Sequence, residues 1–105
     1  MSVIEFEHTV AGQRVGVYHL SLFAPKVMEV VSVFVSPEHR RRGYADQMLT
    51  AITTDADSAG TTLMLDVQPS PGGAPAEALR ELYARHGFVS TGTSTYMTRT
   101  PKGTQ

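Results

Sequence analysis

The sequence contains no cysteine among its 105 residues. This absence excludes a disulfide scaffold, a thiolate metal site and a cysteine nucleophile, and it leaves the redox compartment open. Stability must therefore come from packing, although four phenylalanines, four tyrosines and no tryptophan leave little spare core. A chain of this length is too short for two domains of ordinary size. We predict one domain over residues 1–100, a disordered tail at residues 101–105 and no metal site.

A surplus of charge is also missing, because nine basic residues stand against ten acidic ones and the formal net charge is -1. So balanced a chain does not hold a polyphosphate by electrostatics, and nucleic-acid binding is disfavoured. No apolar run reaches the length of a membrane span, and the start, MSVIEFEHTV, has an acidic flank where a signal peptide carries basic residues. We expect a soluble cytoplasmic protein that is not a membrane protein.

The first third of the chain has the two-residue period of β-strands. Ile4 and Phe6 alternate with Glu5 and Glu7, which predicts a strand over residues 3–10 with one buried face. A turn at residues 11–13 leads to a second strand over residues 15–23, which ends before Pro25. A third run, over residues 27–36, is apolar on both faces and is predicted to be central. Together the three form an antiparallel meander.

After Gly43 the apolar period changes to that of a helix, which Gly60 is suited to cap. A fourth strand over residues 61–67 follows, so strand, helix and strand form a crossover unit with parallel strands. Pro75 suits the first turn of a second helix that ends at Gly87, and one or two short strands are expected in residues 88–99. The predicted fold class is therefore α/β: a meander, a helix crossover to a parallel strand, a second helix and short C-terminal strands.

One stretch, VFVSPEHRRRGYA at residues 33–45, places three arginines before a glycine between a strand and a helix. Such a turn aims unpaired backbone N–H groups and the positive end of the helix dipole at one point, where phosphate oxygens fit. Gly43 lets the backbone approach a ligand closely, and Ala45 is too small to block it. Two other interpretations are a solvated turn and an RNA-binding patch. The charge balance and the lack of an aromatic platform argue against RNA.

The order and spacing of these residues favour an anion pocket. Arg40-x-x-Gly43-x-Ala45 resembles the acetyl-coenzyme A signature of the GNAT superfamily of N-acetyltransferases, and LYARHGF at residues 82–88 is similar to that family's Leu-Tyr-x-x-x-Gly-Phe helix end. The resemblance covers about residues 27–99, with the family's spacing between the two blocks. It implies a GNAT-like fold and direct transfer of acetyl from acetyl-CoA to an amine of a small molecule or peptide. The alternative is a non-catalytic acyl-CoA-binding or regulatory module of the same fold.

The resemblance also implies how the coenzyme is held. The pyrophosphate would sit on the backbone N–H groups of residues 41–46, with Arg40 holding the shape of the loop. The pantetheine arm would pair like an extra strand with residues 33–35, which sets the thioester between that strand and residues 65–67. The residues predicted to bind acetyl-CoA are Val33, Phe34, Val35, Arg40, Arg41, Arg42, Gly43, Tyr44, Ala45 and Asp46.

Acetyl transfer needs one group to take a proton from the ammonium form of the acceptor and one to protonate the leaving thiolate. Tyr83 matches the family's tyrosine near the coenzyme sulfur and is predicted as the general acid, although it could equally serve to pack the helix. Glu29 is the first choice for the base, and a water relay would serve as well. The other strand candidates are Asp66, Glu5, Glu7, His8 and His19. His39 and His86 are assigned to structure.

Three departures from the family pattern bear on activity. Ala76 stands where an asparagine is common, and Asp46 stands where a small hydroxyl residue is common. The carboxylate of Asp46 would oppose bound phosphates unless it points away or pairs with an arginine. The chain also begins at the meander, without the first strand and helix pair that wall the acceptor site in the family. We therefore expect an open acceptor groove, a wall supplied by a second subunit of a homodimer, or a loss of transfer activity.

Overall fold

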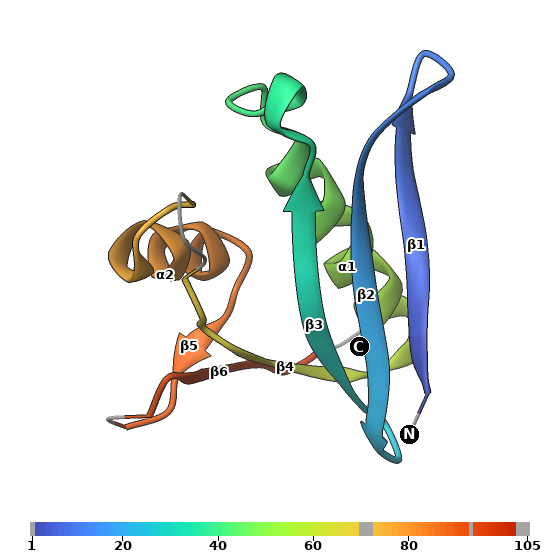
Figure 1. The fold of residues 1–105 in the computed structure, drawn as a ribbon. Helices are drawn as coiled ribbons and strands as arrows, with labels where there is room; N and C mark the ends of the chain where they lie inside the picture. The colour runs from blue at the N-terminus through green and yellow to red at the C-terminus, as the bar shows by residue number, and fades with distance from the viewer. Residues whose placement is uncertain (1, 70–72, 93, 103–105) are drawn as a thin grey trace.

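The structure is a computed structural model that describes residues 2–69, 73–92 and 94–102. Its elements are β1 (Val3–Val10), β2 (Gln13–Ala24), β3 (Val27–Val35), the short 3-10 helix η1 (Pro37–His39), α1 (Tyr44–Ala59), β4 (Thr62–Asp66), α2 (Ala76–Arg85), β5 (Val89–Ser90) and β6 (Tyr96–Arg99). The six strands form one sheet in the order β1-β2-β3-β4-β6-β5 (Figure 1). The predicted α/β fold is confirmed.

The pairing of the strands follows the predicted topology. β1, β2 and β3 are antiparallel neighbours, and α1 then carries the chain across to β4, which is parallel to β3. β4 pairs with β6, and β6 with β5, both antiparallel. After β6 the N–H of Lys102 donates to Asp57 of α1 at 2.8 Å. Residues 103–105 of the predicted tail lie outside the described residues.

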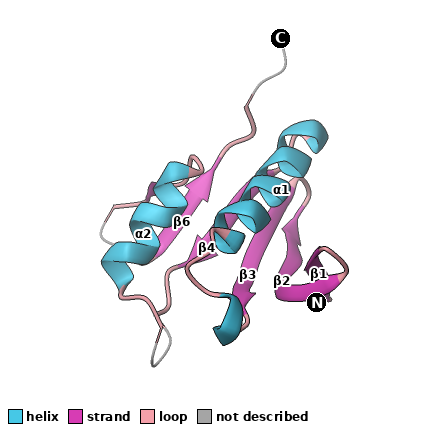
Figure 2. Ribbon diagram, turned by 90° about the horizontal axis from the view of Figure 1, so that it is seen from above, coloured by secondary structure: helices cyan, strands magenta, loops and turns pink. Residues whose placement is uncertain are grey.

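Both helices pack on the same face of the sheet (Figure 2). The core there joins Met48 and Leu49 of α1 to Leu65 of β4 and to Phe88, and Leu82 of α2 packs against it. The opposite face carries no helix from the described part of the chain; we call it the open face. None of the helices described is long and apolar enough to cross a membrane.

The alternation in β1 predicted a buried face, and this expectation is wrong. Ile4 is 50% exposed and Phe6 is 38% exposed. Phe6 stacks on Tyr18 of β2 with ring centroids 5.0 Å apart, and His8 bonds Gln47 of α1, so this face does point toward the helix side. However, β1 is the edge strand, and α1 packs over β2 and β3. The alternation indicates which way the side chains point but not how much covers them.

A β-bulge at Val31 changes which side chains of β3 face the helices. The pairing of β2 with β3 skips this residue. After the skip, Val33 and Val35 pack against the core on the helix face, whereas Phe34 is 46% exposed on the open face together with Ser32. In a strand with strict alternation, Val31, Val33 and Val35 would share one face. The bulge removes Val31 from that set because an extra residue shifts the period by one.

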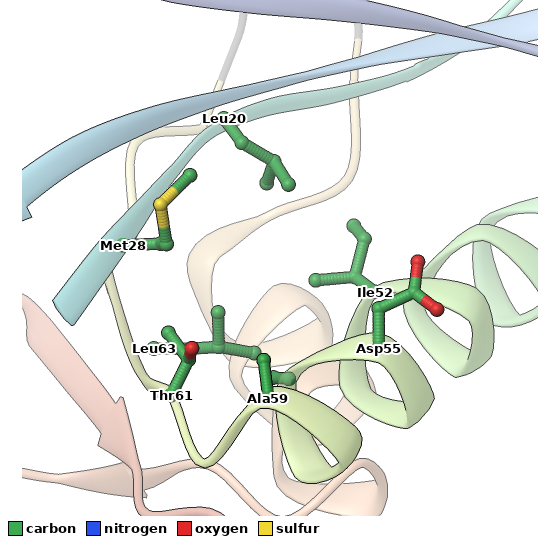
Figure 3. A pocket seen from close by; sticks show the side chains of 8 residues that line it. Leu20, Met28, Ile52, Asp55, Ala59, Thr61 and Leu63 are labelled. Carbon is green, nitrogen blue, oxygen red and sulfur yellow. The ribbon is translucent and has the colours of Figure 1, made fainter. Parts of the chain in front are cut away.

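A small pocket lies between the C-terminal half of α1 and the sheet (Figure 3). Its volume is about 230 Å³. Leu20, Met28 and Leu63 line it from three strands, and Ile52 lines it from α1. A lining that is almost wholly apolar offers few groups to orient a polar ligand, so this pocket is a poor candidate for the functional site.

Candidate active site

The two central strands separate partway along their length. β3 and β4 pair only from Val27–Thr62 to Glu29–Met64 in the described residues, and beyond that point they diverge (Figure 1). A groove of about 1050 Å³ opens between them. The edge of β3 beyond Glu29 therefore has no neighbouring strand on the groove side. Its main-chain groups are free to pair with an extended ligand.

The groove is walled by β3, the loop that follows it, β4 and the region of α2. The predicted site residues that line it are Glu29, Val33, Phe34, Val35, Arg40, Arg41, Ala45 and Tyr83. Arg42, Gly43, Tyr44 and Asp46 do not line it. Sequence reasoning missed Ser32, Gln68, Leu79 and Leu82, which also line the groove. The apolar stripe of the second helix was a signal for the two leucines. The bulge explains why Ser32 points to the open face where it lines the groove.

The loop between β3 and α1 is bent by two left-handed residues. Arg41 has a φ of 65° and Gly43 a φ of 81°. A positive φ is uncommon for a residue other than glycine, so Arg41 marks a constrained turn. Gly43 is the N-cap of α1, and no side chain caps this end of the helix. The first N–H groups of α1 thus lack helical partners and lie at the positive end of the helix dipole, beside the groove-lining Ala45.

Arg40 is tied to the end of β3. Its Nε donates to the carbonyl oxygen of Val35 at 3.0 Å, and its guanidinium carbon lies 5.5 Å from the ring centre of Phe34. A guanidinium over an aromatic face is attracted by the ring electrons. These two contacts fix the path of the chain from the strand into the loop.

The carboxylate of Asp46 is bonded to α2. It accepts hydrogen bonds from Arg85 at 3.1 and 3.2 Å and from His86 at 2.8 Å. The bond from His86, followed by those from Arg85, lowers the pKa of Asp46 below its ordinary value. The aspartate that would have opposed bound phosphates is therefore paired with an arginine, and the pair joins the start of α1 to the end of α2.

Tyr83 lies in the groove wall that α2 provides. Its ring meets Phe88 edge-on with centroids 6.0 Å apart, so it also packs against the core. Burial raises the pKa of Tyr83 above its ordinary value of 10.0. The hydroxyl therefore keeps its proton at neutral pH and can donate it to a group in the groove.

Two carboxylates line the groove, and their surroundings differ. Asp66 accepts hydrogen bonds from Thr95 and Gln68, which lower its pKa. A carboxylate held in its charged form by donors is a weak proton acceptor. Glu29 lies on the opposite wall, in β3. Of the two, Glu29 is the better candidate for a base.

The remaining base candidates lie on β1 and β2. Glu7 pairs with Arg14 at 3.1 Å, and His8 bonds Gln47 on the helix side. Glu5 and His19 bond each other at 3.0 Å on the open face. None of the four lines the groove.

His39 is the last residue of η1, in the connection between β3 and α1, and is only 7% exposed. Its ring meets Tyr44 edge-on with centroids 6.3 Å apart. Neither ring nitrogen has a hydrogen-bond partner among the described residues. The ring therefore acts as a packed spacer, in keeping with the structural assignment of this residue.

Comparison with known proteins identifies the architecture. The sequence model of the acetyltransferase (GNAT) domain matches residues 3–90. A search of curated proteins finds no match. Among solved structures, the ribosomal-protein-S18-alanine N-acetyltransferase from Escherichia coli is 18% identical, with a TM-score of 0.75 over 98% of this chain and 72% of that one. The anti-CRISPR protein AcrVA5 is 18% identical, with a TM-score of 0.74 over 93% of this chain and 98% of that one.

The PaiA N-acetyltransferase from Thermoplasma acidophilum, solved in complex with coenzyme A, is 15% identical, with a TM-score of 0.70 over 93% of this chain. This chain spans only 60% of the length of that enzyme. At such identities these likenesses show the fold alone. The match to the domain model covers most of the chain, and the diverging strands, the arginine-glycine loop and the two helices agree with it. The chain belongs to the GNAT family of acetyltransferases.

Proposed function

We propose that the protein transfers acetyl from acetyl-CoA to an amine of a small molecule or peptide by direct attack of the amine on the thioester. The observation that carries this proposal is the groove between β3 and β4, which has an unpaired strand edge along one wall and the start of α1 at one end. The pantetheine arm would pair with residues 33–35, and the pyrophosphate would meet the N–H groups at the start of the helix.

The coenzyme-binding residues divide into two groups in this proposal. Arg40 and Arg41 line the groove and would place positive charge beside the phosphates. Arg42, Gly43, Tyr44 and Asp46 do not line it and would contribute through the main chain of the loop. The bond from Arg40 to Val35 supports its role in holding the loop.

Tyr83 and Glu29 line the same groove and are the proposed catalytic pair. Glu29 would accept the proton of the ammonium group, which leaves an amine with a free electron pair. The C–N bond would then form at the acetyl carbon as the C–S bond breaks, and the new amide nitrogen would lose its remaining extra proton to water, from which Tyr83 is reprotonated after the reaction. Tyr83, protonated at neutral pH because burial raises its pKa, would give its proton to the departing thiolate.

Calorimetric titration of acetyl-CoA tests the binding half of the proposal, and absence of heat at millimolar coenzyme would refute it. A coenzyme-release assay against a panel of amines and peptides tests the catalytic half. Tyr83→Phe should keep coenzyme affinity and lower turnover by about 100-fold or more, and Glu29→Gln should lower turnover likewise. Tyr96→Phe is the matched control, because Tyr96 does not line the groove and should retain full turnover.

A non-catalytic acyl-CoA-binding module is the second candidate. Ala76 packs against the core at the start of α2, where it offers no polar side chain to the groove. The open face also leaves the acceptor side of the groove without a helical wall in the described part of the chain. Tight coenzyme binding with no turnover on any acceptor, and with no effect of Tyr83→Phe, would favour this function.

We further propose that the protein forms a homodimer in the cytoplasm, where acetyl-CoA would be available. Phe34 is 46% exposed on the open face, and a second subunit over that face would bury it and wall the acceptor groove. A monomeric mass by light scattering at assay concentration would count against the dimer.

A further inference from the structure

Three side chains on the open face form a hydrogen-bonded row across three strands. His19 Nδ1 lies 2.7 Å from Ser32 Oγ, and His19 Nε2 lies 3.0 Å from Glu5 Oε1. The strand register explains the row, because His19 of β2 is the direct partner of both Ser32 in β3 and Glu5 in β1. Directly opposite residues point to the same face of a sheet, so the three side chains meet.

The carboxylate sets the direction of these bonds. A carboxylate only accepts, so Nε2 of His19 carries the hydrogen that Glu5 receives. In the neutral imidazole, Nδ1 then holds the free electron pair and accepts the hydroxyl hydrogen of Ser32. A hydroxyl bonded to a base that a third group orients is the arrangement that activates a serine as a nucleophile.

Ser32 is the member of the row that reaches the groove. It lines the cavity beside Val33, whereas His19 and Glu5 do not. An acyl group held in the groove would therefore meet the hydroxyl of Ser32 before it meets the imidazole of His19 or the carboxylate of Glu5. The imidazole stands behind the hydroxyl, with its side chain 28% exposed.

The same strand can supply donors for the negative oxygen that forms during attack on a carbonyl. The N–H of Ser36 donates to Val15 of β2, and N–H directions alternate along a strand. The N–H groups of Val33 and Val35 therefore point toward the groove, where no strand pairs with them in the described residues. Main-chain donors next to a nucleophile are what an acyl-transfer site requires.

We propose that Ser32 is the nucleophile of a second activity, the hydrolysis of acyl esters and thioesters, with His19 as its general base and Glu5 as the positioning carboxylate. Ser32 Oγ attacks the acyl carbon while its proton moves to His19 Nδ1. The bond to the leaving group breaks, the leaving group takes that proton, and the acyl group stays on Ser32. Water then attacks this ester through the same base, which releases the carboxylic acid and restores the hydroxyl.

The proposed hydrolysis is distinct from transfer to an amine, because it needs no amine acceptor and proceeds through a covalent intermediate. Its test uses p-nitrophenyl acetate, and then acetyl-CoA, with the full chain. We expect a burst of nitrophenolate equal to the amount of protein, and peptide mass spectrometry should find one acetyl group on Ser32. Ser32→Ala should abolish both signals. Ser58→Ala, an exposed serine of α1, is the matched control and should keep both.

The other members of the row should have graded effects on acylation. His19→Gln should slow it by about 100-fold or more, because the general base is lost. Glu5→Gln should slow it only a few-fold, because the Glu5 side chain is 53% exposed and water screens its charge. Ser32→Cys should restore acylation, because its thiol can replace the hydroxyl as the nucleophile. Thermal melting of Ser32→Ala shows whether the loss of acylation in that variant comes from a defect in folding.

The proposal is overturned if the acetyl group is found elsewhere, if no acetylated protein forms from either substrate, or if Ser32→Ala or His19→Gln leaves the rate unchanged. In that case the row only stabilises the meander. Calorimetry with coenzyme A distinguishes failure of the proposed hydrolysis from failure of the proposed transferase function. A protein that carries acetyl on Ser32 but binds no coenzyme refutes the transferase alone, and one that acetylates amines without acylating Ser32 refutes this inference alone.

Discussion

Replacing Gly43 with valine tests whether the backbone of the loop or the charge of its arginines binds the coenzyme. Gly43 has a φ of 81°, and a Cβ built there meets no atom within 4 Å. The cost of the new side chain is therefore backbone strain and not a clash. The left-handed conformation costs an L-residue about 1–2 kcal/mol, and a β-branched residue tolerates it least. The loop can relieve this strain by turning to a negative φ, which redirects the N–H groups at the start of α1.

The expected loss of affinity follows from those N–H groups. A hydrogen bond to a charged group contributes about 1.5–3 kcal/mol, so misplacing one of them should weaken coenzyme binding by roughly 10- to 100-fold. Arg42→Ala removes an exposed charge that does not line the groove. An exposed charge contributes at most about 1 kcal/mol, which limits the loss for this variant to about fivefold.

Calorimetric titration of coenzyme A into both variants measures the difference. Gly60→Val is the matched control, since Gly60 caps the other end of α1 with a φ of 68° and also has no atom within 4 Å of a built Cβ. It should lose similar stability while its coenzyme affinity stays that of the wild type. Unchanged affinity in Gly43→Val, with equal losses as each arginine is removed, would refute the backbone mechanism and identify a charge patch.

Two further predictions concern stability. His39→Phe should raise the free energy of unfolding by about 1–3 kcal/mol, because an apolar ring replaces buried nitrogens without partners; a lower melting temperature would show that the imidazole has a polar partner in solution. Hydrogen bonds from Arg99, and then from the N–H of Lys102, lower the pKa of Asp57 to about 2. The folded pKa lies below the ordinary value of 3.8, so these bonds stabilise the protein above that pH and are lost as pH falls toward 2. Acid unfolding of Asp57→Asn should depend less on pH in this range, and curves identical to those of the wild type would assign the dependence to other groups.

The four longer strands and both α-helices could be predicted because local spacing indicates each of them. Alternating apolar residues indicated the strands, and the change to a helical period after Gly43 marked α1. Glycine and proline then indicated where the elements end, and Gly60 does cap its helix in the left-handed conformation. The spacing of apolar residues does not indicate whether another element packs over that face of the strand. Ile4 and Phe6 alternate as a buried face would, yet the edge position of β1 leaves them exposed.

The candidate site was predictable where a motif fixes the backbone, and not where distant segments meet. The loop motif and the tyrosine motif both led to residues that line one groove, among them Arg40, Ala45 and Tyr83. The partners of Asp46 are the last residue of another helix and its C-cap, 39 and 40 positions along the chain. No local pattern relates an aspartate to a cation so far along the chain. The sequence therefore indicated that Asp46 needs such a partner or must point away, but not which residue the partner is.

The row of Glu5, His19 and Ser32 depends on a single residue that breaks the period. Leu20 pairs with Val30, so an unbroken register would next pair His19 with Val31. Ser32 would then pair with Tyr18 and point toward the helices, into the core. Because the bulge leaves Val31 out, Ser32 instead pairs with His19 and its hydroxyl faces the open side of the groove. Bulges often re-aim a side chain beside a functional site, and here the bulge sets which hydroxyl an acyl group would meet.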